Sequence, residues 1–397
     1  MTAETATPRM PREVWVMVSA GFVIALGYGV VAPALPQFAH SFGVGVTAAS
    51  AIVSAFAVMR LAFAPSSGRL VTRFGERPMY LLGVFIVALS TLASAFAQTY
   101  WQLMLFRGLG GVGSIMFSVS AMGLMIRISP PAIRGRVSGL YSSSFVLGSI
   151  TGPMLGGALI GFGLRVPFVV YAVALFGAIA VVHLQLRGST LAAVDTTTDV
   201  AVMPLPTALR IGAYRSAVVT AAIFGWVYAM RVSLVPLYFS LVLHEPDGVA
   251  GLALATYACG DVIAMMPAGR LSDRIGRRPL IVAGMTVLAL ATLALALTSN
   301  VWIAFASTLV GGIGTGMVSP SQQAVLADVM FGHGRGGPVL VTYQMSQDLG
   351  TVIGPVAGGF LAQEWGFPTA FTVTAVLAGC AAVAWLAVRD SMVVRAA

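Results

Sequence analysis

The segment GRLSDRIGRRP at residues 269–279 connects two long apolar stretches, and a related segment, GRLVTRFGERP, stands at residues 68–78. The two copies are about 201 residues apart, close to half the chain. The same shift places GGVG at 110–113 on GGIG at 311–314. The chain therefore consists of two related halves, and each half carries this segment at the same place.

The composition of the chain requires a lipid environment. Of its 397 residues, 58% are hydrophobic and only 9% are charged, whereas a soluble domain carries about 25% charged residues. A membrane-spanning helix needs about 20 mostly apolar residues, and such windows recur along the whole sequence. We expect twelve spans, at residues 14–36, 45–67, 78–98, 101–126, 137–161, 166–187, 214–241, 248–269, 279–298, 301–328, 338–362 and 366–389.

These spans divide into two groups of six. The long polar connection at 188–213 lies near the middle of the sequence and is expected to be a solvated linker. The predicted organisation is an N-terminal six-helix bundle at 1–187, this linker, and a C-terminal six-helix bundle at 214–397. The expected fold class is an all-α membrane protein of twelve transmembrane helices in two pseudo-symmetric bundles.

The arginines predict the orientation in the membrane. All 22 basic residues are arginine, and cytoplasmic loops retain basic residues. With the N-terminus inside, eighteen arginines fall on the inner side and one, Arg165, falls on the outer side. We therefore expect a multi-pass protein of the inner (plasma) membrane with both termini and the linker in the cytoplasm. The arginines that give the net charge of +9 lie mainly on the predicted cytoplasmic side of the membrane, and this distribution argues against nucleic-acid binding.

The segment at 269–279 resembles, nearly residue for residue, the loop signature G-x-L-x-D-R-x-G-R-R of the major facilitator superfamily of transporters. The first copy departs from that signature at Thr72, where the family has Asp, and at Glu76, where it has Arg. The resemblance covers essentially all twelve spans and is greatest to the proton-coupled drug exporters. It implies the major facilitator fold, in which two six-helix bundles meet around a central cavity.

The resemblance also implies a cytoplasmic latch at these segments, because an Asp at a helix end can pair with Arg or with the N-terminus of a facing helix. In the N-terminal half, Thr72 replaces the acid, and Arg127 occupies the position that Asp328 has in the other half. Glu76 is then the candidate for the missing carboxylate, facing Arg127 or Arg134. The alternative is that these charges only satisfy the positive-inside distribution. The candidate latch residues are Gly269, Asp273, Arg274, Arg277, Asp328, Arg335, Gly68, Arg73, Gly75 and Glu76.

A second motif, G-x(3)-G-P-x(2)-G-G, occurs once in each half. Small residues let helices approach closely, and proline loosens a helix, so the expected role is a seal between the bundles. Ordinary glycine packing in a membrane helix is the alternative. In the resembling families the motif marks exporters. Its two copies are Gly148, Gly152, Pro153, Gly156 and Gly157, and Gly350, Gly354, Pro355, Gly358 and Gly359.

Five ionisable residues fall inside the predicted spans: Arg60, Arg107, Arg231, Asp261 and Asp348. Each costs a few kcal/mol at the bilayer centre unless it is paired or hydrated, so a functional role is the default hypothesis. The resemblance implies that the second and eleventh spans are neighbours across the bundle interface, so Arg60 and Asp348 can pair there directly. Asp261 has no obvious basic partner. Asp261 or Asp348 is the candidate carrier of a coupling proton, and fixed structural ion pairing is the alternative for both.

Arg107 and Arg231 are expected on spans that line the cavity in this family. Arg107 also matches the family's R-x-x-x-G element linked to proton transfer, with Gly110 in place of the usual Gln. Three roles are open for these cations: repelling cationic substrates, pairing with an anionic substrate group, or bonding to backbone carbonyls. The other candidate cavity residues, for which the alternative is a lipid-facing position, are Tyr28, Phe117, Phe224, Trp226, Tyr228, Met317, Gln322 and Gln323.

The function that these observations favour is export of small amphipathic organic compounds in exchange for protons, by alternating access. The alternative is proton-linked or facilitated uptake of a small metabolite, and the two cavity arginines suit an anionic one. The expected partners are a small-molecule substrate, protons and the lipid bilayer, and nothing in the sequence demands more than a monomer. Cys259 and Cys380 lie in apolar spans. We predict no metal site, no cofactor and no enzymatic activity, since no His, Asp or Cys cluster is evident.

Overall fold

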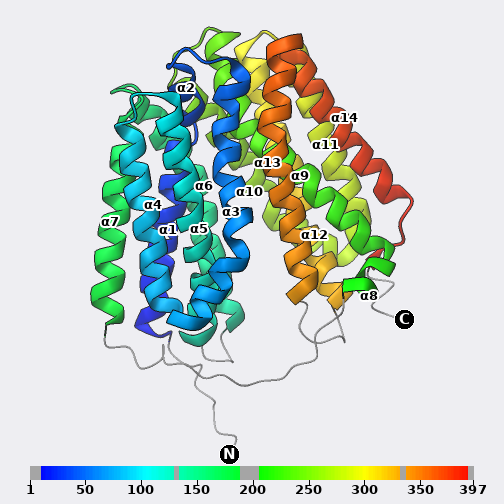
Figure 1. Ribbon diagram of the computed structural model, residues 1–397. Coiled ribbons are helices and arrows are strands. Elements are labelled where there is room, and N and C mark those ends of the chain that lie inside the picture. The colour runs from blue at the N-terminus through cyan, green and yellow to red at the C-terminus, as the bar shows by residue number, and fades with distance from the viewer. Residues whose placement is uncertain (1–9, 129–133, 188–204, 331–336, 392–397) are drawn as a thin grey trace, which may run out of the picture.

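The computed structural model describes residues 10–128, 134–187, 205–330 and 337–391, and every regular element in this part of the chain is a helix (Figure 1). In chain order the helices are α1 (Arg12–Val31), α2 (Ala34–His40), α3 (Val46–Phe74), α4 (Glu76–Ala95), α5 (Tyr100–Ile128), α6 (Arg134–Ile160), α7 (Val166–Leu186), α8 (Leu205–Arg210), α9 (Gly212–Leu241), α10 (Val249–Ile275), α11 (Arg277–Leu297), α12 (Val301–Met330), α13 (Gly337–Trp365) and α14 (Phe367–Leu386).

Each predicted span corresponds to a long helix, with ends that differ by a few residues. Within the described residues, eleven helical segments are long and apolar enough to cross a membrane, and the first of them, Arg12–His40, combines α1 and α2. Helix α13 has similar length but is not among the eleven. Its first half carries Gln344, Gln347 and Asp348, which lower its mean hydropathy, and all three line the central cavity described below. The expected all-helical membrane fold is confirmed.

Three local features differ from the sequence prediction. The first span is interrupted after Val31, and the short α2 follows from Ala34, because Pro33 has no N–H to continue the helical hydrogen bonds. Helix α8 and the start of α9 lie in the segment predicted to be a linker, of which 188–204 falls outside the described residues. The signature segments are not open loops. Each is the last turns of a helix followed by one glycine, Gly75 or Gly276, at a positive φ of 86° or 102°.

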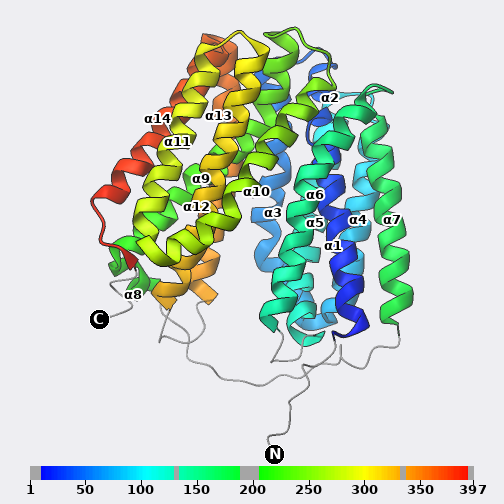
Figure 2. The same cartoon turned by 180° about the vertical axis from the view of Figure 1, so that it is seen from behind.

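The helices form two groups that pack in the same internal order. Helix α1 packs on α6 as α9 packs on α13, and α3 packs on α5 as α10 packs on α12. Between the groups, α3 packs on α13 and α6 packs on α10, which are equivalent contacts under the repeat. Figures 1 and 2 show the groups meeting near α2 and diverging toward α8. We refer below to the α2 end and the α8 end. The domain limits at 187 and 214 stay a prediction.

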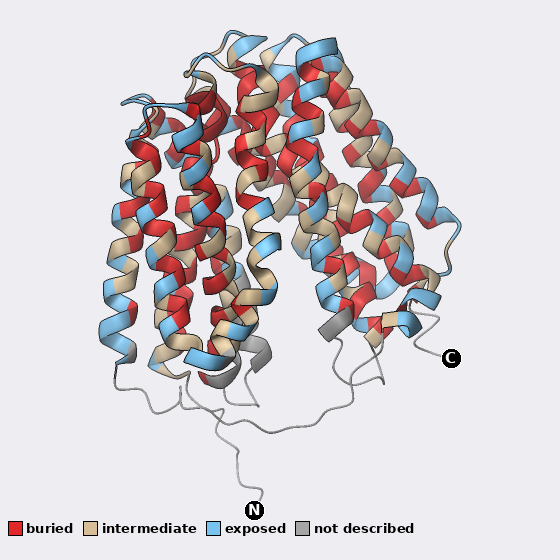
Figure 3. Cartoon of the chain, viewed as in Figure 1, coloured by how far each residue is buried: buried red, intermediate tan, exposed pale blue. Residues whose placement is uncertain are grey.

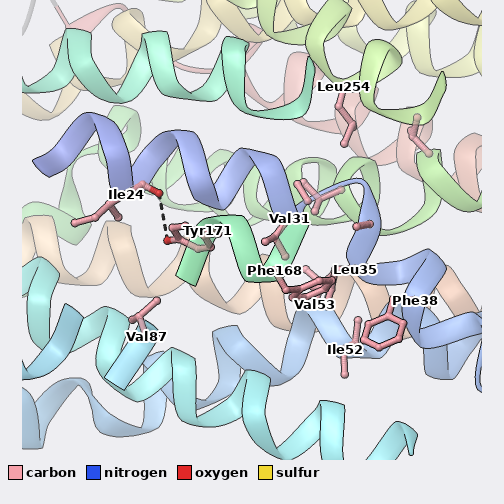
Figure 4. Packing of buried hydrophobic residues seen from close by; sticks show 14 of the residues in the cluster. Ile24, Val31, Leu35, Phe38, Ile52, Val53, Val87, Phe168, Tyr171 and Leu254 are labelled. Atoms are coloured by element: carbon pink, nitrogen blue, oxygen red, sulfur yellow. Dashed lines mark hydrogen bonds between the residues drawn. The ribbon is translucent and has the colours of Figure 1, made fainter. Parts of the chain in front are cut away.

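Apolar side chains lie both in the core and on the outer faces. In Figure 4, residues from α1, α2, α3, α4, α7 and α10 gather near the α2 end, and the Tyr171 hydroxyl donates to the Ile24 carbonyl at 3.3 Å. Large apolar side chains such as Trp101, Trp302 and Met266 are exposed. Figure 3 shows exposed positions along the outer faces of the helices. A soluble protein rarely exposes so many large apolar groups, so these faces are suited to lipid.

Candidate functional site between the two bundles

A cavity of about 590 Å³ lies between the two groups of helices and is lined by residues of both. This volume is in the range of pockets that hold small organic molecules. Most of the lining is apolar or aromatic, and the charged residues in it are Arg60, Arg107, Arg231, Asp261 and Asp348. All five ionisable residues that the sequence placed inside spans therefore face one cavity.

On the α2 side of the cavity, the two groups of helices touch directly. The Ser54 hydroxyl of α3 donates to the Val352 carbonyl of α13 at 2.7 Å. About two turns before Ser54 in α3, and nearer the α2 end, the Thr47 amide donates to Gln363 Oε1 at 3.1 Å. Gln37 Nε2 of α2 donates to the Asp247 carbonyl at 3.2 Å. These contacts close the cavity at the α2 end.

The first glycine motif lies in α6 and contacts two helices. A Cβ at Gly152 would lie 2.5 Å from the Leu26 carbonyl of α1, and a Cβ at Gly148 would lie 2.6 Å from the Leu26 amide nitrogen. Gly156 meets the next turn of α1. These positions, four residues apart, form one face of α6 and pack within the first group of helices. Gly157 points elsewhere: a Cβ there would lie 2.5 Å from the Gly248 carbonyl in the other group.

The second motif repeats this arrangement in α13. Gly350 and Gly354 face the backbone of α9 near Ala222 and Trp226, within the second group of helices. Gly359 faces α3 across the interface, where a Cβ would lie 2.9 Å from Thr47 Cα and would also meet the Ser50 hydroxyl. The last glycine of each motif is thus the one that allows the bundles to approach at the α2 end. A sealing role for the motif stays a prediction that this geometry supports.

Arg107 lies on the wall formed by the first group. Its residue is 7% exposed, and its guanidinium lies over the Phe56 ring at 4.7 Å from the centroid. The side chains of Tyr28 and Tyr171 are close enough to interact electrostatically with Arg107. The Arg107 Nε has no hydrogen-bond partner. A buried cation over an aromatic face is stabilised only in part by that ring.

Asp261 lies on the opposite wall, in α10, and the expectation that it has no basic neighbour is wrong. Arg231 of α9 is within electrostatic reach of Asp261. The Arg231 guanidinium carbon lies 3.9 Å from the Tyr257 ring centroid and 5.1 Å from that of Tyr228. Arg231 lies 10 residues before the end of α9, and Asp261 lies 12 residues after the start of α10. The two helices are consecutive, so the sequence placed both residues at similar depth, and only the rotation of the helices that turns them together was not predicted. Even so, Asp261 Oδ1 is buried and has no hydrogen-bond partner.

Arg60 and Asp348 face the cavity from opposite groups, as expected, but do not form a direct ion pair in the part of the chain that the structure describes. Arg60 Nη1 instead donates to Ser114 Oγ at 2.6 Å. The two charges are still close enough for an electrostatic interaction across the interface. The Ser114 hydroxyl on α5 therefore binds Arg60, while Asp348 remains accessible from the cavity.

Some of the candidate cavity residues line the cavity, and the others lie on helix faces that point away from it. The lining includes Tyr28, Phe117, Phe224, Tyr228 and Arg231 but not the other four candidates. Trp226 donates from Nε1 to Thr374 Oγ1 at 3.0 Å and so points into the second group of helices.

The three remaining candidates are in α12. Met317 packs toward Gly284 of α11, Gln322 is buried and accepts a hydrogen bond from the Tyr343 hydroxyl, and Gln323 is exposed. The residue types had suggested a cavity position for them, whereas the rotation of α12 places them elsewhere.

Sequence reasoning found Asp348 but missed the polar stripe to which it belongs. Gln344, Gln347 and Thr351 face the cavity from α13 together with Asp348. Their spacing of three and four residues places them on one helical face, which is a signal that the sequence contains. The other polar lining residues that the sequence did not indicate are Ser114, Ser118 and Tyr171 in the first group of helices and Tyr257 and Thr315 in the second.

Near the α8 end, the candidate latch residues of the second half form a charge cluster. Arg277 is buried and donates to Asp328 Oδ2 at 3.3 Å and to Asp273 Oδ1 at 2.5 Å. The Ser391 hydroxyl also donates to Asp328 Oδ2, at 2.9 Å. All of these contacts lie within one group of helices.

The other latch candidates add no described contact between the two groups. The Asp390 carboxylate accepts the Arg278 amide at 2.9 Å and so satisfies the start of α11. Arg73 lies over its neighbour Phe74, and Arg274 is exposed. A Cβ added at Gly68 or Gly269 would meet no atom within 4 Å. Arg335 lies outside the described residues, so a latch between the bundles stays a prediction.

The first-half copy places Glu76 at the start of α4, beside Gly123 of α5. A Cβ at Gly123 would lie 2.8 Å from Glu76 Cγ. Gly75 makes the one-residue turn that brings Glu76 to this place. The side chains of Arg127 and Arg134 are outside the described part of the structure, and the predicted pairing with Glu76 stays a prediction.

Two packed groups of membrane helices with a ligand-sized, charged cavity between them define a polytopic membrane protein of the transporter class. A family model described as the Major Facilitator Superfamily matches residues 17–249 and 218–395. The chain belongs to this family, and the resemblance in its signature segments is confirmed.

Comparisons with individual proteins agree with this assignment. The chain is 26% identical over 371 residues to "Multidrug resistance protein 2" of Bacillus subtilis (strain 168), covering 87% of this chain and 88% of that protein. It is 26% identical over 341 residues to "Tetracycline resistance protein, class B" of Escherichia coli, covering 84% of each. Among solved structures, it resembles a bacterial homolog of the human lysosomal transporter Spinster, in an inward-facing and unoccupied conformation. The TM-score is 0.81 at 17% identity, over 96% of this chain and 97% of that one.

Proposed function

We propose that this transporter exports small amphipathic organic compounds in exchange for protons, by alternating access. The observation that carries the proposal is the cavity between the bundles, which contains aromatic rings and two acids and has contacts between the bundles at its α2 end. Aromatic and apolar surfaces bind amphipathic compounds of varied shape. The named multidrug and tetracycline resistance relatives support a substrate of this kind.

The orientation follows from the arginines. Because basic residues concentrate at the α8 end, that end is expected to face the cytoplasm. The contacts at the α2 end then close the outer side, and the cavity is accessible from inside. The structural similarity to a protein described as inward-facing supports the same reading. Export requires the reverse state, in which the α2-end contacts separate and the α8 end closes.

The two cavity acids supply a means of coupling. Arg60 and Asp348 lie on opposite bundles and attract each other across the cavity. A proton on Asp348 removes that attraction and so changes the relative stability of the two states. Asp261 is on the same bundle as its neighbour Arg231, so a proton there changes the charge of the binding wall. A transporter can use either acid to link proton movement to the conformational change.

The test uses purified protein in liposomes with a pH-sensitive dye inside and an imposed proton gradient. Tetracycline and ethidium serve as named probes. We expect probe-dependent proton movement opposite to the probe, abolished in Asp261→Asn or Asp348→Asn. Asp247→Asn, an acid of the α2-end loop outside the cavity, is the matched control and should retain exchange.

Uptake of a small anionic metabolite is the second candidate function, because Arg107 and Arg231 face the same cavity. Movement of probes without protons, or with protons in the same direction, would contradict exchange. Either result would make uptake the better proposal.

A further inference from the structure

The charges of the cavity do not balance. Three arginines and two aspartates line it among the described residues. Arg60 has Asp348 as its opposite charge, and Arg231 has Asp261. Arg107 is left without a carboxylate, so the cavity carries one cation more than its own acids neutralise.

Arg107 is built to receive an anion. It is almost fully buried, its Nε has no hydrogen-bond partner, and its neighbours are the Phe56 ring and the hydroxyl groups of Tyr28 and Tyr171. A buried charge without a partner is unfavourable, and a planar guanidinium binds carboxylates in a fixed geometry. An anionic ligand group at this wall would satisfy both the charge and the free donor.

On the opposite wall, Asp261 supplies a hydrogen-bond acceptor without a partner. Asp261 Oδ1 is buried and accepts no hydrogen bond, although Arg231 is near enough to interact with the carboxylate. Tyr257, which lines the cavity beside Asp261, uses its hydroxyl with Thr315. A free carboxylate oxygen accepts a donor, which is either a proton or an N–H group of a ligand.

We propose that the substrate is an amphipathic zwitterion whose anionic group binds Arg107 and whose ammonium group binds Asp261. This inference rests on the proposed function and names its substrate class. The two unpartnered atoms belong to opposite bundles, so a ligand that meets both connects α5 to α10. Between them the lining supplies aromatic rings, among them Tyr28, Phe117 and Tyr228, for an apolar body.

This chemistry also explains exchange. An ammonium group and a proton compete for the same Asp261 oxygen, so a substrate that binds the protein while Asp261 carries a proton displaces that proton to solvent, and a proton that binds Asp261 displaces the substrate. An anion without an ammonium group would not compete, because it would meet Arg107 alone. A cation without an anionic group would compete but would lose the contact with Arg107. Tight binding and proton release therefore coincide only for the zwitterion.

Three probes on one aromatic body test the inference: 4′-(aminomethyl)biphenyl-4-carboxylate, biphenyl-4-carboxylate and 4-biphenylmethylamine. Binding to the full chain in lipid nanodiscs is measured by calorimetry in buffers of different ionisation enthalpy, which reports proton release. We expect the zwitterion to bind about 10- to 100-fold more tightly than either single-charge probe, since each charged hydrogen bond contributes that much. Proton release should accompany the zwitterion and the amine but not the carboxylate.

Variants of Arg107 and Asp261 test which residue binds the carboxylate of the probe and which binds its ammonium group. Arg107→Gln should weaken the zwitterion to the affinity of the amine and leave the amine unchanged. Asp261→Asn should weaken the zwitterion to the affinity of the carboxylate and abolish proton release. Arg107→Lys keeps the charge and should give intermediate affinity, so it tests the inference even where Arg107→Gln does not fold. Arg210→Gln in α8, outside the cavity, is the control and should bind all three probes like the wild type.

Equal affinity of the three probes, or equal weakening of all three by Arg107→Gln, would overturn the inference. If the wild-type protein exchanges tetracycline for protons but does not prefer the zwitterion, the zwitterion proposal fails and the proposed function stands. If the zwitterion is preferred but moves with protons in the same direction, the recognition proposal stands and the exchange proposal fails.

Discussion

The two copies of the signature segment end in the same one-glycine turn, but the residues that follow carry opposite charges. After Gly276, Arg277 is buried against Asp328 of α12. At the repeat-equivalent positions of the first half stand Glu76 and Arg127, so the two signs are exchanged. Both halves therefore carry one acid and one arginine at these two positions, but the acid and the arginine have exchanged places. We predict that Glu76 and Arg127 attract each other as Arg277 and Asp328 do, with the partners exchanged.

The interfaces near the α2 end differ in another way. Gly157 of α6 meets the backbone of α10 at Gly248 and Gly251, whereas its counterpart Gly359 meets Thr47 and the Ser50 side chain of α3. Backbone atoms cannot move aside without shifting a helix, while a hydroxyl can change rotamer. The contacts of Gly157 are therefore all with backbone, whereas Gly359 has one backbone contact, with Thr47 Cα at 2.9 Å, and a shorter one with a side chain that can adjust.

The largest effect is expected at the charge cluster of the second half. Asp328→Asn leaves buried Arg277 with the Ser272 hydroxyl and, among the described carboxylates in contact with it, Asp273, whose side chain is 69% exposed. Removing one partner of a buried pair costs about 3–5 kcal/mol. Asp273→Asn, on the same arginine, should cost less than about 1 kcal/mol because that carboxylate is exposed to solvent. Unfolding in detergent, followed by temperature and by denaturant, measures both, and equal losses would contradict the assignment of Asp328 as the main partner.

A smaller effect is expected from a methyl group at the α2-end interface. Gly157→Ala places a Cβ against the Gly248 carbonyl and should disfavour this closed interface by about 1–3 kcal/mol. Gly359→Ala should cost less because the Ser50 hydroxyl can turn away, and Ser50→Gly should recover part of the loss. The measurement is the labelling rate of Ser54→Cys, in a background without Cys259 and Cys380, by an impermeant thiol reagent added outside. A faster rate in Gly359→Ala than in Gly157→Ala would refute the comparison.

The sequence predicted the spans well because apolar length is a local property, and α3 and α9 begin within two residues of their predicted starts. It also placed Arg107 and Arg231 on cavity-lining spans, and both line the cavity. Arg60 and Asp348, which it placed across the bundle interface, line the same cavity, as is common for ionisable residues inside membrane spans. It did not predict the rotation of α12, which turns Gln322 toward Tyr343. Composition cannot fix that rotation because α12 has polar residues on more than one face.

The rotation of neighbouring helices was the other limit of the sequence. Arg231 and Asp261 are at similar depth on the consecutive helices α9 and α10, but the rotation that brings the two side chains together depends on packing that no local pattern encodes. By contrast, the stripe from Gln344 to Thr351 on α13 is periodic, and this signal was available. The break between α1 and α2 was also indicated by Pro33, although the surrounding apolar run reads as one continuous span.

The smallest effect is expected in the first-half copy, and it tests directly whether the exchanged signs form a pair. Glu76 is half-buried, so Glu76→Arg alone should lower stability by about 1 kcal/mol. If Arg127 is its partner, Glu76→Arg with Arg127→Glu gives this half the polarity of Arg277 and Asp328 and should recover most of the loss. A double-mutant cycle on melting in detergent then gives a coupling energy of about 0.5–1 kcal/mol. The exposed Arg69→Glu, combined with Glu76→Arg, keeps the same net charge and should show no coupling. Coupling to Arg134→Glu instead would move the partner to the start of α6, and coupling to neither arginine would show that the reversed signs serve only the positive-inside distribution.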